Sequence, residues 1–158
     1  MRQGDHTACE IPSSSSSRED IIEILGSCRS IAIVGISPKA ERDSNKVARY
    51  LISQGYEVVP VNPGQREILG RQCYRNLNEI PFKVDAANLF LNNSRVPQVV
   101  DEAIEKGVNA IWMQLGVVHN DAAEKARNAG IRVIMNMCIM REHRFLSDHI
   151  QRPQVQTV

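Results

Sequence analysis

The chain has 158 residues, of which 42% are hydrophobic and 23% are charged, and its formal net charge is +1. This length and composition suit one domain with a single substantial core. The near-neutral charge disfavours a protein that holds a nucleic-acid backbone. The longest apolar runs are much shorter than the roughly 20 residues of a membrane helix, so no membrane segment is expected.

The N-terminal stretch reads as a polar leader, because it contains the run Ser13–Ser17 and lacks the continuous apolar core of a secretory signal. We expect a disordered leader at 1–17, a folded domain at 18–146 and a loose polar tail at 147–158, in a cytoplasmic protein. The four cysteines form no C-x-x-C pair and are interpreted as reduced thiols. The four histidines include no H-E-x-x-H pattern, so no metal site is expected.

Short apolar stretches alternate with helical patterns along the chain. Strands are predicted at 30–35, 56–61, 85–91, 109–114 and 131–135, and helices at 18–27, 44–55, 94–106 and 120–130. Strands separated by helices of this length are joined by right-handed crossovers, which produce a parallel sheet with helices on both faces. We therefore predict a Rossmann-like three-layer α/β fold with five parallel strands in the order 3-2-1-4-5. This order places the ligand crevice beyond the carboxyl ends of strands one and four.

The turn after the first strand has the features of an anion site. Gly35 permits a tight turn, and Ser37, Ser44 and nearby backbone amides can donate hydrogen bonds to a phosphate. Ser44 is also predicted to cap the following helix, whose N-terminus favours negative charge. Three residues of the same segment add positive charge: Lys39, Arg42 and Lys46. This combination suits a pyrophosphate-bearing nucleotide, although a glycine that only ends the strand, with solvated cations beside it, explains the local pattern equally well.

Two common nucleotide-binding motifs are absent. A G-x-G-x-x-G repeat cannot be aligned with this turn, and the second strand ends in Val61-Asn62-Pro63, where an NAD-binding domain usually has Asp or Glu. The pattern G-x-x-x-x-G-K-[ST] is missing as well. These absences disfavour a nicotinamide cofactor and a P-loop ATPase.

Three segments carry a family resemblance: Ala32–Ser37 (AIVGIS), Gly55–Pro63 (GYEVVPVNP) and Ile111–Gly116 (IWMQLG). In their order and spacing they resemble the small coenzyme A (CoA)-binding proteins related to the nucleotide-binding domain of the succinyl-CoA synthetase alpha subunit. The resemblance covers residues 21–146 and implies that CoA lies across the carboxyl ends of the strands. It extends only to the nucleotide-binding part of that subunit and therefore does not imply acyl-CoA ligase activity.

The resemblance also implies a set of ligand contacts. Contacts with the CoA phosphates are implied for Gly35, Ile36, Ser37 and Lys39, supported by Arg42 and Ser44. Contacts with the rest of the ligand are implied for Asn62, Pro63, Phe90, Gln114 and Gly116. The family commonly has Phe-Arg-Arg after the third strand and Asp-Arg-Cys after the fifth. This chain has Phe90-Leu91-Asn92 and Asn136-Met137-Cys138 there, so one expected cationic contact is lost.

Three functions stay open. The first is a CoA or acyl-CoA binding module that senses or stores its ligand, or presents it to a protein partner, without turnover. The second is an enzyme, either an NAD(P)-dependent oxidoreductase or a CoA transferase, that uses Cys138 or His143. The third is a redox-responsive protein whose Cys138 is capped by CoA. Against the catalytic roles, no base adjoins Cys138 in sequence, and His143 is interpreted as a surface residue of a terminal helix. Trp112 is interpreted as a core residue and His119 as a helix cap.

Overall fold

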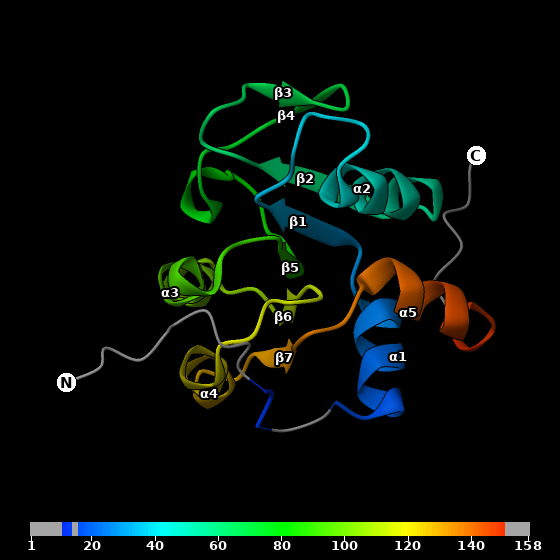
Figure 1. Cartoon of the computed structure of the whole chain (residues 1–158), viewed down its shortest axis with the longest axis vertical. Helices are drawn as coiled ribbons and strands as arrows, with labels where there is room; N and C mark the ends of the chain where they lie inside the picture. Colours follow the sequence, from blue (N-terminus) through cyan, green and yellow to red (C-terminus); the bar gives the residue numbers. More distant parts are fainter. Residues whose placement is uncertain (1–10, 14–15, 151–158) are drawn as a thin grey trace.

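The computed structural model of the protein describes residues 11–13 and 16–150. Its centre is a five-stranded parallel sheet made of β1 (Ser30–Val34), β2 (Glu57–Val61), β5 (Ala86–Leu89), β6 (Ala110–Met113) and β7 (Arg132–Ile134). One face is covered by α1 (Arg18–Ser27), α2 (Asp43–Ser53) and α5 (Ile139–Leu146), and the other by α3 (Val96–Lys106) and α4 (Asn120–Asn128) (Figure 1). The predicted three-layer α/β fold with five parallel strands is confirmed. Within the described ranges, no helix combines the length and apolar character needed to cross a bilayer.

The predicted strand order is wrong. The sheet runs β2-β1-β5-β6-β7, so that the third long strand lies beside the first and the order is 2-1-3-4-5. The outer edge of β2 is already occupied, because Tyr74 forms a parallel bridge with Val61 there. The Tyr74 N–H donates to the Pro60 carbonyl at 3.0 Å, and the Asn62 N–H donates to the Tyr74 carbonyl at 2.8 Å. The topological switch therefore lies between β1 and β5.

The connection between β2 and β5 contains a small hairpin that the sequence patterns did not reveal. Its strands are β3 (Glu67–Ile68) and β4 (Arg71–Gln72), and a 3-10 turn follows at η1 (Leu77–Glu79). The two residues at the hairpin tip, Leu69 and Gly70, have φ angles of 55° and 70°. Two successive left-handed residues are what a type I′ turn requires. In Figure 1 the hairpin lies beyond β2, at the upper end of the sheet.

Each face of the sheet packs into its own core. Ile33 and Trp112 belong to the core under α1, α2 and α5, and Val34 and Met113 belong to the core under α3 and α4. Because neighbouring residues of a strand point to opposite faces, a sheet covered on both sides needs apolar residues at nearly every strand position. Trp112 is only 1% exposed, which confirms its interpretation as a core residue.

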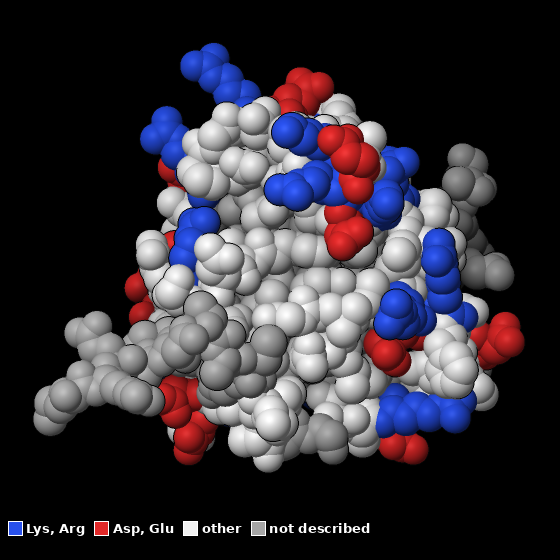
Figure 2. Space-filling view, in the orientation of Figure 1, with Lys and Arg blue, Asp and Glu red and all other residues white. Residues whose placement is uncertain are grey.

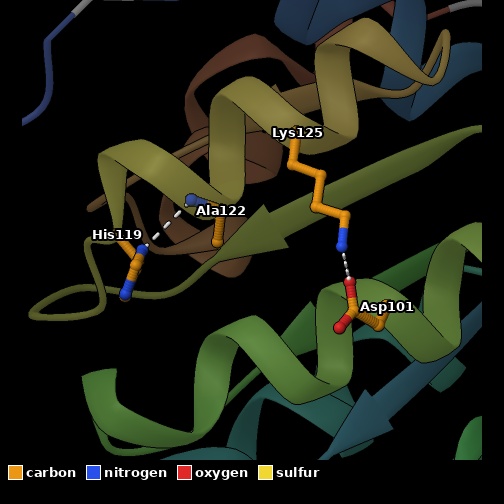
Figure 3. A network of polar contacts seen from close by, with 4 residues as sticks. All are labelled: Asp101, His119, Ala122 and Lys125. Carbon is orange, nitrogen blue, oxygen red and sulfur yellow. Dashed lines mark hydrogen bonds and ion pairs between the residues drawn. The ribbon is translucent and has the colours of Figure 1, made fainter.

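Polar contacts at the surface cap α4 and join it to α3 (Figure 3). His119 is the N-cap of α4, and its Nδ1 accepts a hydrogen bond from the Ala122 N–H at 3.1 Å, which confirms its predicted capping role. Lys125 of α4 forms an ion pair with Asp101 of α3 at 2.6 Å. Both partners of this pair are at least half exposed, so it contributes less than about 1 kcal/mol.

The predicted leader and tail are described only in part. Within the leader, the Ser13 N–H donates to Asn120 Oδ1 at 2.7 Å, and Asn120 Nδ2 donates to the Ile11 carbonyl at 2.8 Å. Ser17 caps α1 by accepting from the Asp20 N–H at 3.1 Å. After α5 the chain forms a short 3-10 turn at η3 (Ser147–His149). Residues 1–10, 14–15 and 151–158 lie outside the described residues, and the predicted boundaries of leader and tail stay predictions.

Candidate functional site

A crevice of about 580 Å³ opens where β1, β2, β5 and β6 end. Six of the residues predicted to contact a ligand line it: Gly35, Asn62, Pro63, Phe90, Gln114 and Gly116. The crevice includes the ends of β1 and β5, between which the chain changes direction across the sheet, and such switch points are where open parallel sheets bind ligands. Its volume falls within the roughly 300–1,000 Å³ typical of small-molecule sites.

Gly35, at the end of β1, contacts the backbone at the ends of both neighbouring strands, β2 and β5. Its N–H donates to the Val61 carbonyl at 2.9 Å, and the Phe90 N–H donates to the Val34 carbonyl at the same distance. The φ angle of Gly35 is +86°, and a Cβ atom added there would lie 2.1 Å from the Phe90 carbonyl oxygen. Any larger side chain would therefore push apart the ends of β1 and β5 at the floor of the crevice.

The loop from Gly35 to α2 is held by hydrogen bonds within itself. Ser44 does not cap α2 as predicted, because the helix begins at Asp43 with Arg42 as its N-cap residue. Instead, the Ser44 hydroxyl oxygen accepts from the Ser37 N–H at 2.9 Å. The side chain of Asn45 donates to the Ser37 carbonyl at 2.9 Å. Ser37 is thus fixed through both of its backbone polar groups, and its hydroxyl oxygen also accepts from the Lys39 N–H at 3.1 Å.

The predicted cations of this loop lie outside the crevice lining. Lys39 and Arg42 are exposed, and two carboxylates, those of Glu41 and Asp43, share the same segment. Figure 2 shows blue and red atoms intermixed over the part of the surface formed by α2 and the loop before it. The loop therefore presents a mixed surface instead of a concentrated positive patch.

Asn62 links the loops that follow β1 and β2. Its Nδ2 donates to the carbonyl of Ile36 at 2.8 Å, and its Oδ1 accepts from the Gly64 N–H at 2.8 Å. Ile36 is fully buried, so its side chain belongs to the core and only its backbone reaches the site. Pro63 is exposed beside Asn62 and forms one wall of the crevice.

The loop after β6 forms the opposite wall. The Gln114 N–H donates to the Leu89 carbonyl at 3.2 Å, and the Gln114 carbonyl accepts from the Val117 N–H at 2.8 Å. The Gly116 N–H donates to Asn136 Oδ1 at 2.8 Å. Gln114 itself is only 6% exposed, and its side-chain oxygen has no hydrogen-bond partner among the described residues. A buried acceptor with an unmet hydrogen bond therefore lies in the wall of the crevice.

The cation that lines the crevice is one that the sequence analysis missed. Arg95 lines it from the start of α3 and also lines an adjoining pocket of about 230 Å³, together with Arg75. A 3-10 turn, η2 (Asn93–Arg95), carries the chain back towards the crevice after β5. A basic residue just before a helix that follows a parallel strand is the signal that could have identified Arg95. Four further lining residues were also missed: Leu91, Asn92, Leu115 and Val117.

The two candidate catalytic residues do not line the crevice. Cys138 is 8% exposed and is the N-cap residue of α5. The interpretation of His143 as a surface residue is wrong, because it is only 4% exposed on the face of α5 that packs inwards. Its Nδ1 lies 2.7 Å from the Tyr50 hydroxyl, and its ring packs edge-on against Tyr50 and Tyr56. Partial burial raises the pKa of Tyr50, and the neighbouring Arg144 opposes this shift.

The cysteines and acidic residues of the described part of the chain form no candidate metal site. Cys28, Cys73 and Cys138 are buried, and Cys9 lies outside the described residues. Burial also raises the pKa of the Cys73 thiol, which keeps it protonated at neutral pH. No cluster of three metal-ligating side chains occurs within 11–13 and 16–150.

Comparison with known proteins relates this site to a family. The family described as "CoA binding domain" matches residues 29–144. The uncharacterised protein YneT of Bacillus subtilis (strain 168) is 35% identical over 127 residues, which cover 80% of this chain and 94% of YneT. A solved structure of a hypothetical protein from Pyrococcus horikoshii OT3 is 42% identical, with a TM-score of 0.82, and the match covers 87% of this chain and 97% of that one.

A longer relative contains the same domain as one of its parts. The alpha subunit of acetate–CoA ligase (ADP-forming) I of Pyrococcus furiosus is 33% identical over 129 residues. The match covers 72% of this chain but only 28% of that subunit, so most of the ligase subunit has no counterpart in it. From the match across residues 29–144, the chain belongs to the CoA binding domain family.

Proposed function

We propose that the protein binds CoA or an acyl-CoA in the crevice, and that it senses, stores or presents this ligand without turning it over. The observation that carries the proposal is the crevice at the β1/β5 switch point, in a chain of the CoA binding domain family. Its volume suits a large part of such a ligand, and the adjoining pocket lined by Arg75 and Arg95 extends it.

The crevice walls differ in chemistry, so different parts of them suit different parts of the ligand. Arg95 offers a forked set of N–H donors that suits phosphate oxygens. Ser37 lies in the loop that follows Gly35, outside the lining of the crevice, and would reach the phosphates from there. Lys39 and Arg42 stand outside the lining, in a segment where the carboxylates of Glu41 and Asp43 offset their charge. Ser44 would act through Ser37, whose N–H it holds.

The apolar and amide groups suit the remainder of the ligand. Asn62 and Pro63 would border the nucleotide, where the Asn62 side chain is already fixed by two hydrogen bonds. Phe90, Gln114 and Gly116 would lie beside the pantetheine arm, and Ile36 would contribute only its backbone. A site that is largely held in place before the ligand arrives loses little entropy on binding.

The absence of turnover is supported by the kind of side chains present. Among the described residues that line the crevice, the one ionisable side chain is Arg95, and the adjoining pocket adds Arg75 and the carboxylate of Glu102. A guanidinium stays protonated in proteins and cannot move a proton at neutral pH, whereas acyl transfer requires a nucleophile or a general base. The thiol and imidazole that could fill these roles, Cys138 and His143, are buried away from the lining.

Direct binding of CoA tests the proposal. Denaturing the purified protein should release CoA or a thioester that mass spectrometry identifies, and the stripped protein should bind added CoA in a calorimetric titration. Incubation with acetyl-CoA should leave the thioester intact beyond its spontaneous hydrolysis. A wild-type protein that is purified empty and gives no heat with CoA would refute binding, and enzymatic consumption of the thioester would refute the passive role.

Arg95→Gln should weaken CoA binding about tenfold or more, because a charge-assisted hydrogen bond in the crevice is lost. Titration at two salt concentrations should also give a smaller salt dependence for this variant. Arg141→Gln is a matched control, since Arg141 is exposed on α5 and lines none of the pockets described above. Equal affinities for the wild type and both variants would remove Arg95 from the site.

Cys138→Ser should leave CoA affinity unchanged within about twofold, and it should not alter any CoA adduct formed in the native protein under diamide. The reason is that Cys138 is buried at the start of α5 and does not line the crevice. Intact-mass measurement before and after diamide treatment checks this, with Cys73→Ser as a second buried thiol. A CoA adduct present in the wild type and lost in Cys138→Ser alone would favour the redox-responsive alternative.

A further inference from the structure

Two buried amides in the described part of the chain have polar atoms without hydrogen-bond partners. They are the Nδ2 and Oδ1 atoms of Asn88 and the Oε1 atom of Gln114. Asn88 is fully buried and Gln114 is 6% exposed. Native proteins pair nearly all such atoms, and unpaired ones at the edge of a binding crevice call for a specific explanation.

The sheet register puts both amides on the same face. Asn88 of β5 pairs with Trp112 of β6, and Gln114 lies two residues beyond Trp112, so all three side chains point to the α1, α2 and α5 side. Gln114 lines the crevice directly. On β5, the next residue on this face after Asn88 is Phe90, whose half-buried side chain also lines the crevice. The two amides therefore lie on neighbouring strands, one at the crevice wall and one just beneath it.

Packing alone does not explain an asparagine at this position. The residues paired with Asn88 on either side are Ile33 and Trp112, which are both apolar and buried. A leucine would fill a similar volume without an unmet hydrogen bond, and strands buried on both faces usually carry such residues. A residue that breaks the local packing rule at the carboxyl end of a parallel strand is typical of a functional position.

We infer that Asn88 and Gln114 form a two-amide subsite that binds the pantetheine arm of the ligand through its amide or thioester groups. This inference rests on the proposed function and extends it to the part of CoA that carries the acyl group. The arm contains secondary amides, each with one N–H donor and one carbonyl acceptor. Gln114 Oε1 accepts from such an N–H, and Asn88 Nδ2 donates to a carbonyl once the fully buried Asn88 side chain becomes accessible from the crevice.

The hydrogen-bonding chemistry selects the arm over the phosphates. Phosphate oxygens only accept hydrogen bonds at neutral pH, so they cannot satisfy the Gln114 oxygen. Binding the arm would pair two of the three unpaired buried atoms, Gln114 Oε1 and Asn88 Nδ2, and sites built this way discriminate strongly against ligands that lack the matching group. The protein should therefore bind CoA more tightly than the nucleotide half of CoA. The difference in affinity should exceed the difference that the extra contact area alone would give.

Calorimetric titration of the full chain with two ligands tests the subsite. The ligands are CoA and 3′-phosphoadenosine 5′-diphosphate, which lacks the arm. Gln114→Met and Asn88→Leu, which keep the side-chain volume without the amide, should each weaken CoA binding about tenfold or more. They should change binding of the nucleotide by less than about twofold. The matched control is Asn128→Leu, at the exposed end of α4, which should change neither affinity.

The melting temperature of the ligand-free protein gives a second, independent measurement. Asn88→Leu should raise it by about 2 °C or more, because an unpaired buried amide is removed. If Asn88 had only a structural role, its replacement would instead lower the melting temperature. The ratio of the affinities for CoA and for the nucleotide would then stay unchanged. That result, or an equal loss of both ligands in the variants, overturns the inference while the proposed function stands. A wild-type protein that binds neither ligand overturns both.

Discussion

Gly35→Ala is expected to destabilise the protein by about 2–5 kcal/mol. A left-handed backbone at a residue with a side chain costs about 1–2 kcal/mol, and forcing an atom into a packed region adds about 1–3 kcal/mol or more. Both costs apply here, because φ is +86° and the added Cβ would lie 2.1 Å from the Phe90 carbonyl oxygen. The Phe90 backbone cannot move without breaking its hydrogen bond to Val34. Chemical denaturation of the two proteins measures the difference.

Gly130→Ala is the matched control for this prediction. Gly130 has nearly the same φ angle, +85°, but no atom lies within 4 Å of its added Cβ. This variant should therefore show only the backbone cost, about 1–2 kcal/mol. Equal destabilisation of the two variants would mean that the contact with Phe90 does not constrain the crevice floor. If Gly35→Ala folds at low temperature, its CoA affinity should also fall, whereas that of Gly130→Ala should not.

Trp112→Ala is expected to cost about 3–5 kcal/mol, since it empties a fully packed position in the centre of the sheet. Trp112→Phe is the more informative change. It retains an aromatic ring but loses the Nε1–H, which donates to the Met137 carbonyl at 2.8 Å. That carbonyl precedes α5 and would be left without this donor, at a cost of about 1–3 kcal/mol. The neighbouring Asn136 holds Gly116 at the crevice, so CoA affinity should fall as well.

Denaturation and CoA titration of the Trp112 variants should be compared with Ile134→Val. Ile134 is buried on the same face of the sheet, but its replacement removes one methyl group and no hydrogen bond. It should cost about 0.5–1.5 kcal/mol and leave CoA affinity unchanged. A Trp112→Phe protein with wild-type stability and wild-type affinity would show that the Met137 contact does not support the site.

The positions of the five long strands could be predicted from the sequence, but their order could not. Each strand is a short apolar run, such as Ser30–Val34, and this local signal identifies a doubly covered parallel strand. Which strands lie side by side depends on contacts between distant residues. Here β5 pairs with β1, and the Tyr74 segment pairs with the outer edge of β2, which no local pattern around Tyr74 indicates.

The hairpin was missed for a different physical reason. Its strands, Glu67–Ile68 and Arg71–Gln72, are too short to show an alternating pattern. Its tip requires two left-handed residues, for which Asn-Gly or Asp-Gly is the usual sequence. The chain has Leu69-Gly70 instead, and a leucine in the left-handed region is uncommon because its side chain crowds the backbone.

The crevice walls could be predicted better than the residues deeper in the fold. Asn62, Phe90 and Gln114 each follow the end of a parallel strand, and that position alone brings them to one edge of the sheet. The sequence does contain a signal that His143 is buried, namely its spacing from Ile139 and Leu146. These three residues are four and three positions apart, which is the spacing of one buried helix face.

Both edge strands of the sheet, β2 and β7, are protected against the addition of a strand from another molecule. On one side the Tyr74 segment already pairs with the backbone of β2. On the other side β7 has three residues, Arg132 is engaged by Glu23 at 3.0 Å, and the Val133 carbonyl accepts from the Ser16 hydroxyl at 3.5 Å. Short, charged and partly covered margins are how natural sheets avoid intermolecular β-pairing. Concentrated solutions of the protein should accordingly resist the growth of amyloid-like aggregates.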